Sequence, residues 1–165
     1  MVESNLDNTI LENAFLSLSN LSGTSLKKAY LSNTNCYGAL FENANLSLAH
    51  LNRSNLTAAT LINANLNNAN LSHANLTDAD LTNASLKGAN LTGACFRNTI
   101  ISKRAILEVK NITMKQLEGC IIYFQENKSY IKTSKYKKII EQLHSDFHSE
   151  DSIVPKEVLI KYFEI

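Results

Sequence analysis

The chain has 165 residues, of which 44% are hydrophobic and only 7% aromatic, with no tryptophan. A chain of this length is normally one domain, and this composition favours a narrow core of aliphatic side chains. The net charge is +1 at pH 7, and residues 1–102 carry neither a basic stripe nor an aromatic stacking platform, which excludes direct nucleic-acid binding as a leading function.

The first residues, Met1-Val2-Glu3-Ser4-Asn5, have neither a basic start nor an apolar run. We therefore expect no secretory signal and no membrane anchor. The cytoplasm is the expected compartment, with secretion as an effector without a cleaved signal as the alternative.

Residues 63–81 repeat with a period of five, in which alanine, then asparagine or aspartate, then leucine precede two polar residues. In an α-helix, leucines at every fifth residue would be distributed around the whole circumference and would form no buried stripe. In a flat strand an odd period sends successive leucines to opposite faces. The pattern therefore predicts a chain that turns a corner every five residues and coils, with each leucine pointing inward.

The same register extends from Leu6 to Ile101, over twenty units in which every central residue is apolar. Two positions earlier in each unit, from Ser4 to Thr99, stands Ser, Thr or Ala. Residues two apart on extended chain share a face, so the small and the central residues share the interior. Burial of each central leucine contributes roughly 1.5–3 kcal/mol, which predicts stability distributed over neighbouring coils.

This tandem Ala-(Asn/Asp)-Leu-x-x pattern resembles the pentapeptide-repeat family. The resemblance implies an all-β solenoid, a right-handed quadrilateral β-helix with four units per coil, and hence about five coils in residues 1–102. Residues twenty apart then stack in columns such as Leu16, Cys36, Leu56, Leu76 and Phe96. Asparagines before the central residue are expected to hold turns and to ladder between coils.

Three cysteines, Cys36, Cys95 and Cys120, lack the spacing of metal ligands. We interpret all three as reduced packing residues.

Large apolar residues interrupt the polar exterior in the N-terminal half. Ile10, Tyr30 and His50 fall in one column; the others are Phe15, Leu18, Tyr37, Leu40, Leu48 and Ile62. Such a group predicts a contact surface, with Ile10, Phe15, Tyr30 and Tyr37 as candidates, or else packing against the chain's own tail. The bare first coil is a second candidate interface, because a free strand edge invites pairing.

Residues 103–165 are predicted to form a C-terminal cap. Thr113 and Gln116 have the pattern of a capping box, and residues 120–124 could form one more rung. Helical spacing predicts amphipathic helices at about 134–148 and 155–164, so we expect helices only after residue 112.

We expect a homodimer, because the bare first coil and the apolar face of the helix pair are two surfaces that one chain can hardly cover. The resemblance implies that Val158, Leu159, Tyr162 and Phe163 form the two-fold contact. The alternative is a monomer whose helices fold back on the last coil.

No catalytic, cofactor-binding or metal site is predicted, since a rod filled with leucine offers no cleft for convergent groups. His144 and His148 are spaced for a metal on one helix face, but no carboxylate or cysteine pattern accompanies them.

The best-known activity of the family is mimicry of duplex DNA, which protects gyrase and topoisomerase IV from quinolones. DNA carries one negative charge per roughly 1.7 Å, so five coils of about 4.8 Å each would need about 14 negative charges. Residues 1–102 contain six acidic and five basic residues, a net of −1. Several protective members of the family carry loop insertions in their coils. The repeat of this chain is uninterrupted and lacks such loops.

The sequence therefore favours a non-catalytic bacterial scaffold that presents a rigid surface to an unidentified protein partner. A topoisomerase-protecting DNA mimic, a secreted effector and an accessory module of an enzyme are the alternatives.

Overall fold

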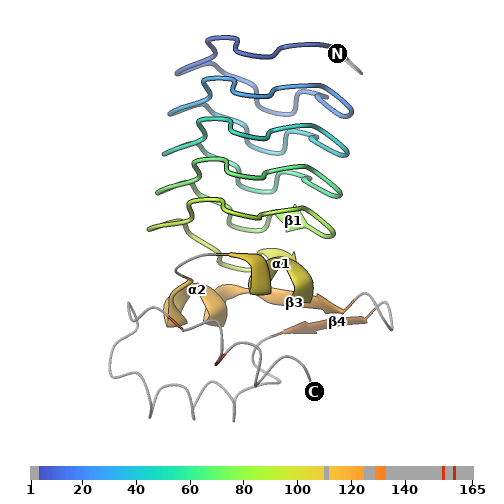
Figure 1. Cartoon of the computed structure of the whole chain (residues 1–165), viewed down its shortest axis with the longest axis vertical. Helices are drawn as coiled ribbons and strands as arrows, with labels where there is room; N and C mark the ends of the chain where they lie inside the picture. The colour runs from blue at the N-terminus through green and yellow to red at the C-terminus, as the bar shows by residue number, and fades with distance from the viewer. Residues whose placement is uncertain (1–3, 110–111, 125–128, 133–153, 155–157, 159–165) are drawn as a thin grey trace.

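The computed structural model describes residues 4–109, 112–124, 129–132, 154 and 158. Residues 4–102 wind into a rod of stacked coils, with the N-terminus at one end (Figure 1). Helices α1 and α2 and strands β3 and β4 lie beyond the other end of the rod (Figure 1). Counted from the N-terminus, the first three coils are residues 4–23, 24–43 and 44–63.

Parallel backbone pairing between coils joins residues that are twenty apart, as in the column Ile10, Tyr30, His50, Asn70 and Asn90. The N–H of Leu31 donates to the carbonyl of His50 at 2.7 Å, and the N–H of His50 donates to the carbonyl of Ala29 at 2.9 Å. Each coil therefore contains four pentapeptides. We number its four sides by the central residues of the first coil, Leu6, Leu11, Leu16 and Leu21.

Each pentapeptide ends in a tight turn that redirects the chain. The N–H of Ala29 donates to the carbonyl of Leu26 at 3.0 Å, and Lys28 between them has φ of 58°. A positive φ at the third residue is the requirement of a type II turn, which Asn and Gly meet most easily. The same position is left-handed throughout the rod, from Asn8 to Asn98.

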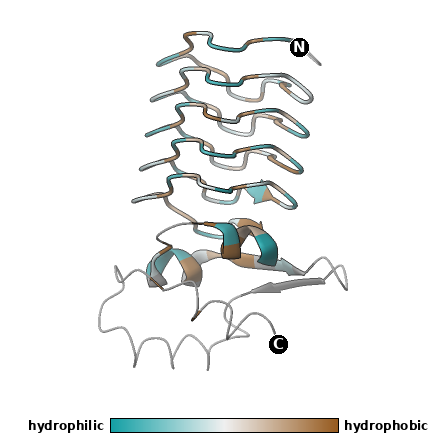
Figure 2. Ribbon diagram, viewed as in Figure 1, coloured by the Kyte–Doolittle hydropathy of each residue, from teal (hydrophilic) through white to brown (hydrophobic). Residues whose placement is uncertain are grey.

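The interior is a stack of central leucines lined by the small residues. From Leu21 to Leu91 the central side chains are at most 1% exposed, and Cys36 and Phe41 are fully buried among them. Along each coil, hydrophobic and hydrophilic residues alternate in the ribbon (Figure 2). Hydroxyls at the small position bond to backbone carbonyls: Thr34 Oγ1 donates to Leu31, the central residue of the preceding unit, at 2.7 Å, and Thr99 Oγ1 donates to Leu76 of the preceding coil at 2.7 Å. Buried Ser and Thr are therefore tolerated where size permits.

Asparagines before the central residue hold the turns and ladder between coils, as predicted. The Oδ1 atom of Asn65 accepts from the N–H of Asn67 at 3.1 Å, an Asx-turn arrangement. Asn55 Nδ2 donates to Asn35 Oδ1 of the preceding coil at 3.2 Å.

A short helix follows the repeat directly, which corrects the expectation that helices begin only after residue 112. Strand β1 (Asp80–Leu81) pairs in parallel with β2 (Ile100–Ser102), and α1 (Lys103–Glu108) begins at the next residue. Ala105 and Ile106 of α1 are buried. Six residues are too few to show a helical period, and for this reason the sequence did not reveal α1.

Helix α2 (Met114–Gly119) begins with the predicted capping box, in which Thr113 Oγ1 accepts from the N–H of Gln116 at 3.3 Å. The Gln116 side chain is buried, and its Nε2 donates to the carbonyl of Leu91 at 2.8 Å. This bond ties α2 to the rod.

Strand β3 (Ile121–Phe124) pairs in parallel with β2, and β4 (Ser129–Lys132) pairs antiparallel with β3. The change to antiparallel pairing ends the parallel stack at this end of the rod.

The helices predicted at 134–148 and 155–164 lie outside the described residues, except for Val158. Val158 packs partly buried against the chain's own core. Val154 is 3% exposed, and its N–H donates to the carbonyl of Ile112 at 2.9 Å. In the part of the chain that the structure describes, no helix is long and apolar enough to cross a membrane.

We expect Leu66→Asp to unfold the rod, because Leu66 is fully buried and an unpaired buried charge costs several kcal/mol. Thermal melting followed by circular dichroism measures the effect. Asn68→Asp adds the same charge at an exposed position and serves as the matched control, with a change within about 0.5 kcal/mol. A soluble Leu66→Asp protein that melts as cooperatively as the wild type would contradict the assigned interior.

Candidate functional site: the apolar surface of the first three coils

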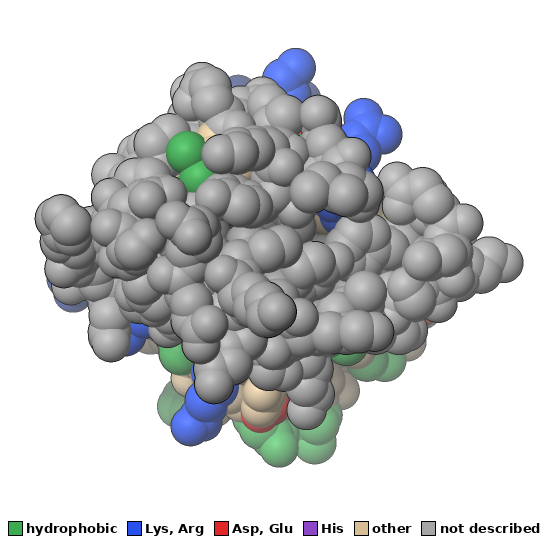
Figure 3. All heavy atoms as spheres, turned by 90° about the horizontal axis from the view of Figure 1, so that it is seen from below, with side chains coloured by type: hydrophobic (Ala, Val, Ile, Leu, Met, Phe, Trp, Pro, Cys, Tyr) green, Lys and Arg blue, Asp and Glu red, His purple; other side chains and the backbone are tan. Residues whose placement is uncertain are grey.

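Large exposed apolar side chains gather in the first three coils of the rod. In the described part of the chain they are Ile10, Phe15, Leu18, Tyr30, Tyr37, Leu40 and Leu48. In a view from below, hydrophobic side chains are visible at the edge of the molecule (Figure 3). We call these seven residues the N-terminal apolar surface.

These residues differ from the other members of their own columns. Tyr30 and His50 are followed by Asn70 and Asn90, and Phe15 is followed by three asparagines and Cys95. Leu48 stands where Asn8 and Asn68 stand in other coils. Because column mates share one backbone environment, the polar residues show what the coil itself requires there. The coil geometry therefore does not explain the apolar ones.

Tyr30 and Leu48 border a hollow of about 310 Å³ on one side of the rod. The Tyr30 and His50 rings stack in parallel, with centroids 4.8 Å apart and planes 1° apart, as their shared column predicted. Lys28 also lines the hollow, and polar walls come from Asn8, Asn68 and Asn70. The hollow thus combines an apolar floor with one ammonium group.

A second apolar group, Leu18, Tyr37 and Leu40, lies on the opposite side. Leu40 is ten residues from Tyr30, half of a twenty-residue coil, which places the two on opposite sides of the rod. Leu18 lies over Gly38, because a Cβ atom on Gly38 would be 2.7 Å from Leu18 Cδ2. No single flat partner can cover both groups.

Leu18 and Leu48 occupy the left-handed turn position, with φ of 58° and 61°. Leucine is less suited to this conformation than Asn or Gly, and its side chain here is 72% and 40% exposed, respectively. These leucines add both backbone strain and exposed apolar area. The same turn position is left-handed along the whole rod, so the exposed apolar area distinguishes these two leucines and the backbone conformation does not.

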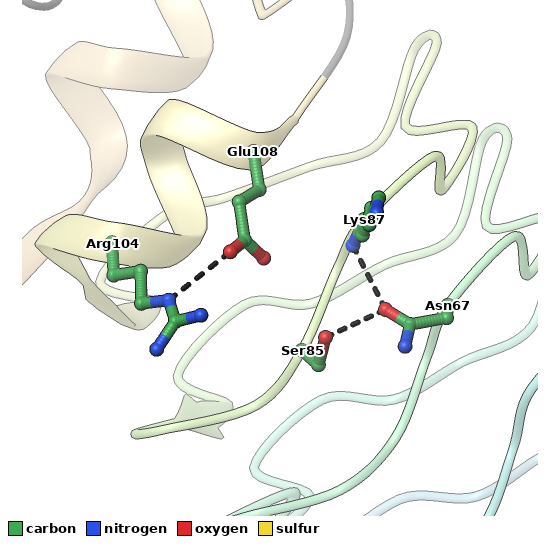
Figure 4. Close-up of polar contacts among 5 residues, drawn as sticks. All are labelled: Asn67, Ser85, Lys87, Arg104 and Glu108. Atoms are coloured by element: carbon green, nitrogen blue, oxygen red, sulfur yellow. Dashed lines mark hydrogen bonds and ion pairs between the residues drawn. The ribbon is translucent and has the colours of Figure 1, made fainter.

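Polar groups near the far end of the rod are paired with one another. Asn67 Oδ1 accepts from Ser85 Oγ at 2.6 Å and from the N–H of Lys87 at 3.1 Å (Figure 4). Arg104 Nε donates to Glu108 Oε1 at 3.1 Å within α1, an exposed ion pair that contributes little to stability (Figure 4). A hollow of about 340 Å³ is lined by Arg104, Glu108 and Ser85 and by other mostly polar residues. We interpret it as a structural feature of the junction between the rod and α1.

The three cysteines differ in environment, which corrects the interpretation of Cys95 as a packing residue. Cys36 and Cys120 are buried, and burial raises the pKa of both thiols, to about 12 for Cys120. Cys95 is exposed and lies in a hollow of about 840 Å³ with Arg97 and Lys115. The hydroxyl of Thr77, then the backbone and charge of Arg97 and the charge of Lys115, lower its pKa.

The predicted contact residues Ile10, Phe15, Tyr30 and Tyr37 are all exposed, and the structure brings Tyr30 together with Leu48. The sequence identified Leu48 as an outward residue but did not reveal the hollow. Leu48 lies in the turn between two sides of the rod, and only the geometry of this turn shows that it borders the same hollow as Tyr30. Of the predicted dimer residues, Val158 packs partly on its own core, and Leu159, Tyr162 and Phe163 lie outside the described residues.

Metal-ligating side chains are not grouped in threes anywhere among the described residues. Ser25 Oγ donates to Asp7 Oδ1 at 2.6 Å, and the same carboxylate oxygen accepts from the N–H of Lys27 at 2.9 Å, so Asp7 joins the first coil to the second. Cys95 Sγ has Thr77 Oγ1 as a side-chain neighbour at 3.4 Å.

The sequence profile of pentapeptide repeats matches residues 1–35, 34–72 and 64–102 in eight copies. This match spans more than half of the chain, so the chain belongs to the pentapeptide-repeat family. Members of this family form right-handed quadrilateral β-helices. No curated protein matches the chain.

Several solved structures are similar to this chain. A pentapeptide-repeat protein of the Arabidopsis thaliana thylakoid lumen is 26% identical, with 59% of this chain and 68% of that chain covered and a TM-score of 0.32. HetL, a pentapeptide-repeat protein of Nostoc involved in heterocyst differentiation regulation, is 27% identical, with 79% and 63% covered and a TM-score of 0.21. The chain thus spans about two thirds of each of these proteins.

Full-length QnrB1, a plasmid-mediated fluoroquinolone resistance protein, is 17% identical, with 87% of this chain and 96% of that chain covered and a TM-score of 0.35.

We expect iodoacetamide to modify Cys95 before the other two cysteines in the folded protein at about pH 8, just below the ordinary thiol pKa of about 8.5. Cys95 is exposed and its lowered pKa makes more thiolate at that pH, whereas Cys36 and Cys120 are buried with raised pKa values. Mass spectrometry of peptides over time measures the order.

Thr77→Val removes the hydroxyl that lowers the Cys95 pKa and should shift the pH profile of its alkylation to higher pH. Equal rates for all three thiols in the folded protein would overturn the assignment.

Proposed function

We propose that this protein is a non-catalytic scaffold, a rod of about five coils with a C-terminal helical cap, which binds another protein through the hollow beside Tyr30. The observation that supports this proposal best is the replacement of column asparagines by Tyr30 and Leu48 around a hollow. Family membership agrees with a binding role, since the family places many roles on one scaffold.

The chemistry of the hollow defines the partner that fits it. Tyr30 and Leu48 offer apolar contact, and tyrosines are frequent anchors of protein interfaces. Lys28 stands beside them with its ammonium group available to a carboxylate. We therefore propose a partner that inserts an apolar side chain flanked by an acidic residue.

The rigidity of the rod supports this role. The backbone around the hollow is bonded to both neighbouring coils, as the N–H of Tyr30 to Thr9 of the first coil and the N–H of Leu31 to His50 of the third coil illustrate. A surface held in this way loses little conformational freedom on binding, which favours affinity.

We expect the double variant Tyr30→Asn/Leu48→Asn to lose its partner while it keeps its fold, because Asn70 and Asn68 occupy the same columns. Quantitative affinity purification from the native host identifies the proteins retained by the wild type. Calorimetry with the purified partner then measures the affinity. A loss of about 2 kcal/mol, roughly a thirtyfold weaker complex, is expected for a pair of anchor residues.

The matched control is Tyr37→Thr, which places the residue of Thr57 and Thr77 at an exposed position of the other apolar group. It should bind the partner as the wild type does. Equal binding by the double variant, loss of binding only in the control, or retention of no protein at stoichiometric level would each contradict the proposal.

Charge argues against the alternative of a DNA mimic. Among the described coil residues the acidic side chains are Asp7, Glu12, Glu42, Asp78 and Asp80, which are spread over all four sides of the rod. Lys27 and Lys87 share a column with Asp7. The described surface therefore carries no acidic stripe of the kind that duplex DNA presents.

At micromolar protein we expect gyrase supercoiling in the presence of a quinolone to be neither protected nor inhibited, because no such acidic stripe is present. A supercoiling assay with a protective family member as positive control measures this. Clear protection at stoichiometric concentration would promote the DNA-mimic function over the scaffold.

A further inference from the structure

The N-terminal end of the rod presents backbone groups that are bonded everywhere else in their columns. The N–H of Tyr30 donates to the carbonyl of Thr9 at 2.9 Å, and its carbonyl accepts from Leu11 at 2.8 Å. The corresponding N–H and C=O groups of Ile10 and Phe15 have no partner within the described residues. Both groups point away from the second coil, as the unpaired groups of an edge strand do.

Apolar side chains gather at the same edge. Ile10, Phe15 and Leu18 are 78%, 86% and 72% exposed, the three largest values among the exposed apolar residues of the described chain. All three belong to the first coil, and the same columns turn polar toward the far end, at Asn70, Asn75 and Asp78, for example. Apolar character is therefore concentrated where the backbone is unpaired.

The interior adds further apolar area at this end. Leu6, Leu11 and Leu16 are only partly buried, whereas the central leucines of the following coils are almost fully buried. Among the described residues, the first coil thus combines partly buried central leucines with unpaired backbone groups.

The four-sided shape of the edge restricts what can cover it. Ile10 and Phe15 begin two successive sides, so a straight peptide strand pairs with one side and leaves the next unpaired. Another coil end turns its corners at the same spacing and pairs with successive sides together. At the far end of the rod β3 already pairs with β2 on one side, and Gln116 of α2 donates to the carbonyls of Leu91 and Ala94, so that end is at least partly covered by the chain itself.

We propose that two copies of this chain associate through their N-terminal coils, end to end and related by a two-fold axis. The two-fold makes facing edges antiparallel, and a residue with both N–H and C=O free, such as Ile10 or Phe15, can exchange both bonds with its counterpart. The contact closes on itself, so it gives a dimer and no filament.

The available area indicates a weak but specific dimer. Aromatic side chains bury about 150–250 Å² each, so Phe15 with the five aliphatic residues at this end offers several hundred Å² per copy. Standard stable interfaces bury about 800 Å² per partner. We therefore expect a dissociation constant in the micromolar range. The contact uses residues of the first coil and is independent of the partner proposed for the Tyr30 hollow.

Light scattering of the full-length protein over a concentration series provides the first test. The mass should rise from 18.3 kDa toward twice this value. Ile10→Asn/Phe15→Asn introduces the residues of Asn70 and Asn75 from the same columns, which the coil accommodates. This variant should weaken the dimer at least tenfold, and in dilute, monomeric protein its melting temperature should equal that of the wild type.

The matched control Tyr37→Thr/Leu40→Thr removes exposed apolar area from the second coil and should leave the dimer intact. It uses the residues that the same columns contain at Thr57 and Thr60. A wild type that stays monomeric at every concentration, or a dimer that the Ile10→Asn/Phe15→Asn variant leaves unchanged, would overturn the proposal.

A distance measurement separates this contact from one at the C-terminal end. A spin label on Lys27→Cys, in a Cys95→Ser background, lies on the second coil of each copy. Three coil spacings of about 4.8 Å then separate the labels along the axis, so the distance should be below about 30 Å. Labels more than about 50 Å apart would place the contact at the C-terminal end and contradict the proposal.

Discussion

Backbone hydrogen bonds between residues about twenty positions apart are the constraint on which the rest of the structure depends. The N–H of Tyr30 donates to Thr9 in the coil before, and the N–H of Leu31 donates to His50 in the coil after, so the second coil is fixed on both sides, and the same bonds recur along the rod. These bonds stack the turns, and the stacked turns aim each central leucine at the axis. A buried backbone group without a partner is costly, so the register cannot slip by one unit at low cost.

This constraint leaves the exterior free to vary. A column position needs a residue that suits its backbone, and Asn meets this need at Asn35, Asn55 and Asn75 through Asx turns and side-chain ladders. Phe15 in the same column contributes nothing of this kind. The apolar residues of the first three coils are therefore best understood as binding residues on a frame whose stability comes from elsewhere.

Most of the rod could be predicted from the sequence, because a five-residue period with a small residue and a leucine permits few other arrangements. The period identified Leu66 as buried. The number of sides came from the family resemblance, and with it the shared column of Tyr30 and His50. The left-handed turn position was missed, although the Asn and Gly residues that recur there, such as Asn8 and Gly23, were a usable signal.

Other features depend on tertiary contacts that no local pattern encodes. Helix α1 is six residues long and is held by burial of Ala105 and Ile106 at the end of the rod. Cys95 was assigned to the interior by its residue type, whereas its place before the central Phe96 sends it outward. The hollow beside Tyr30 could not be predicted, because the sequence does not show that the turn at Leu48 brings this side chain to the same hollow as Tyr30.

Residue-resolved amide hydrogen exchange in dilute, monomeric protein tests the account most directly. The account predicts strong protection for the amides of Tyr30, Asn35 and Leu31, which are bonded between coils, and rapid exchange for those of Ile10 and Phe15 at the free end. Protection of Ile10 and Phe15 equal to that of Tyr30 and Asn35 in the monomer would contradict it.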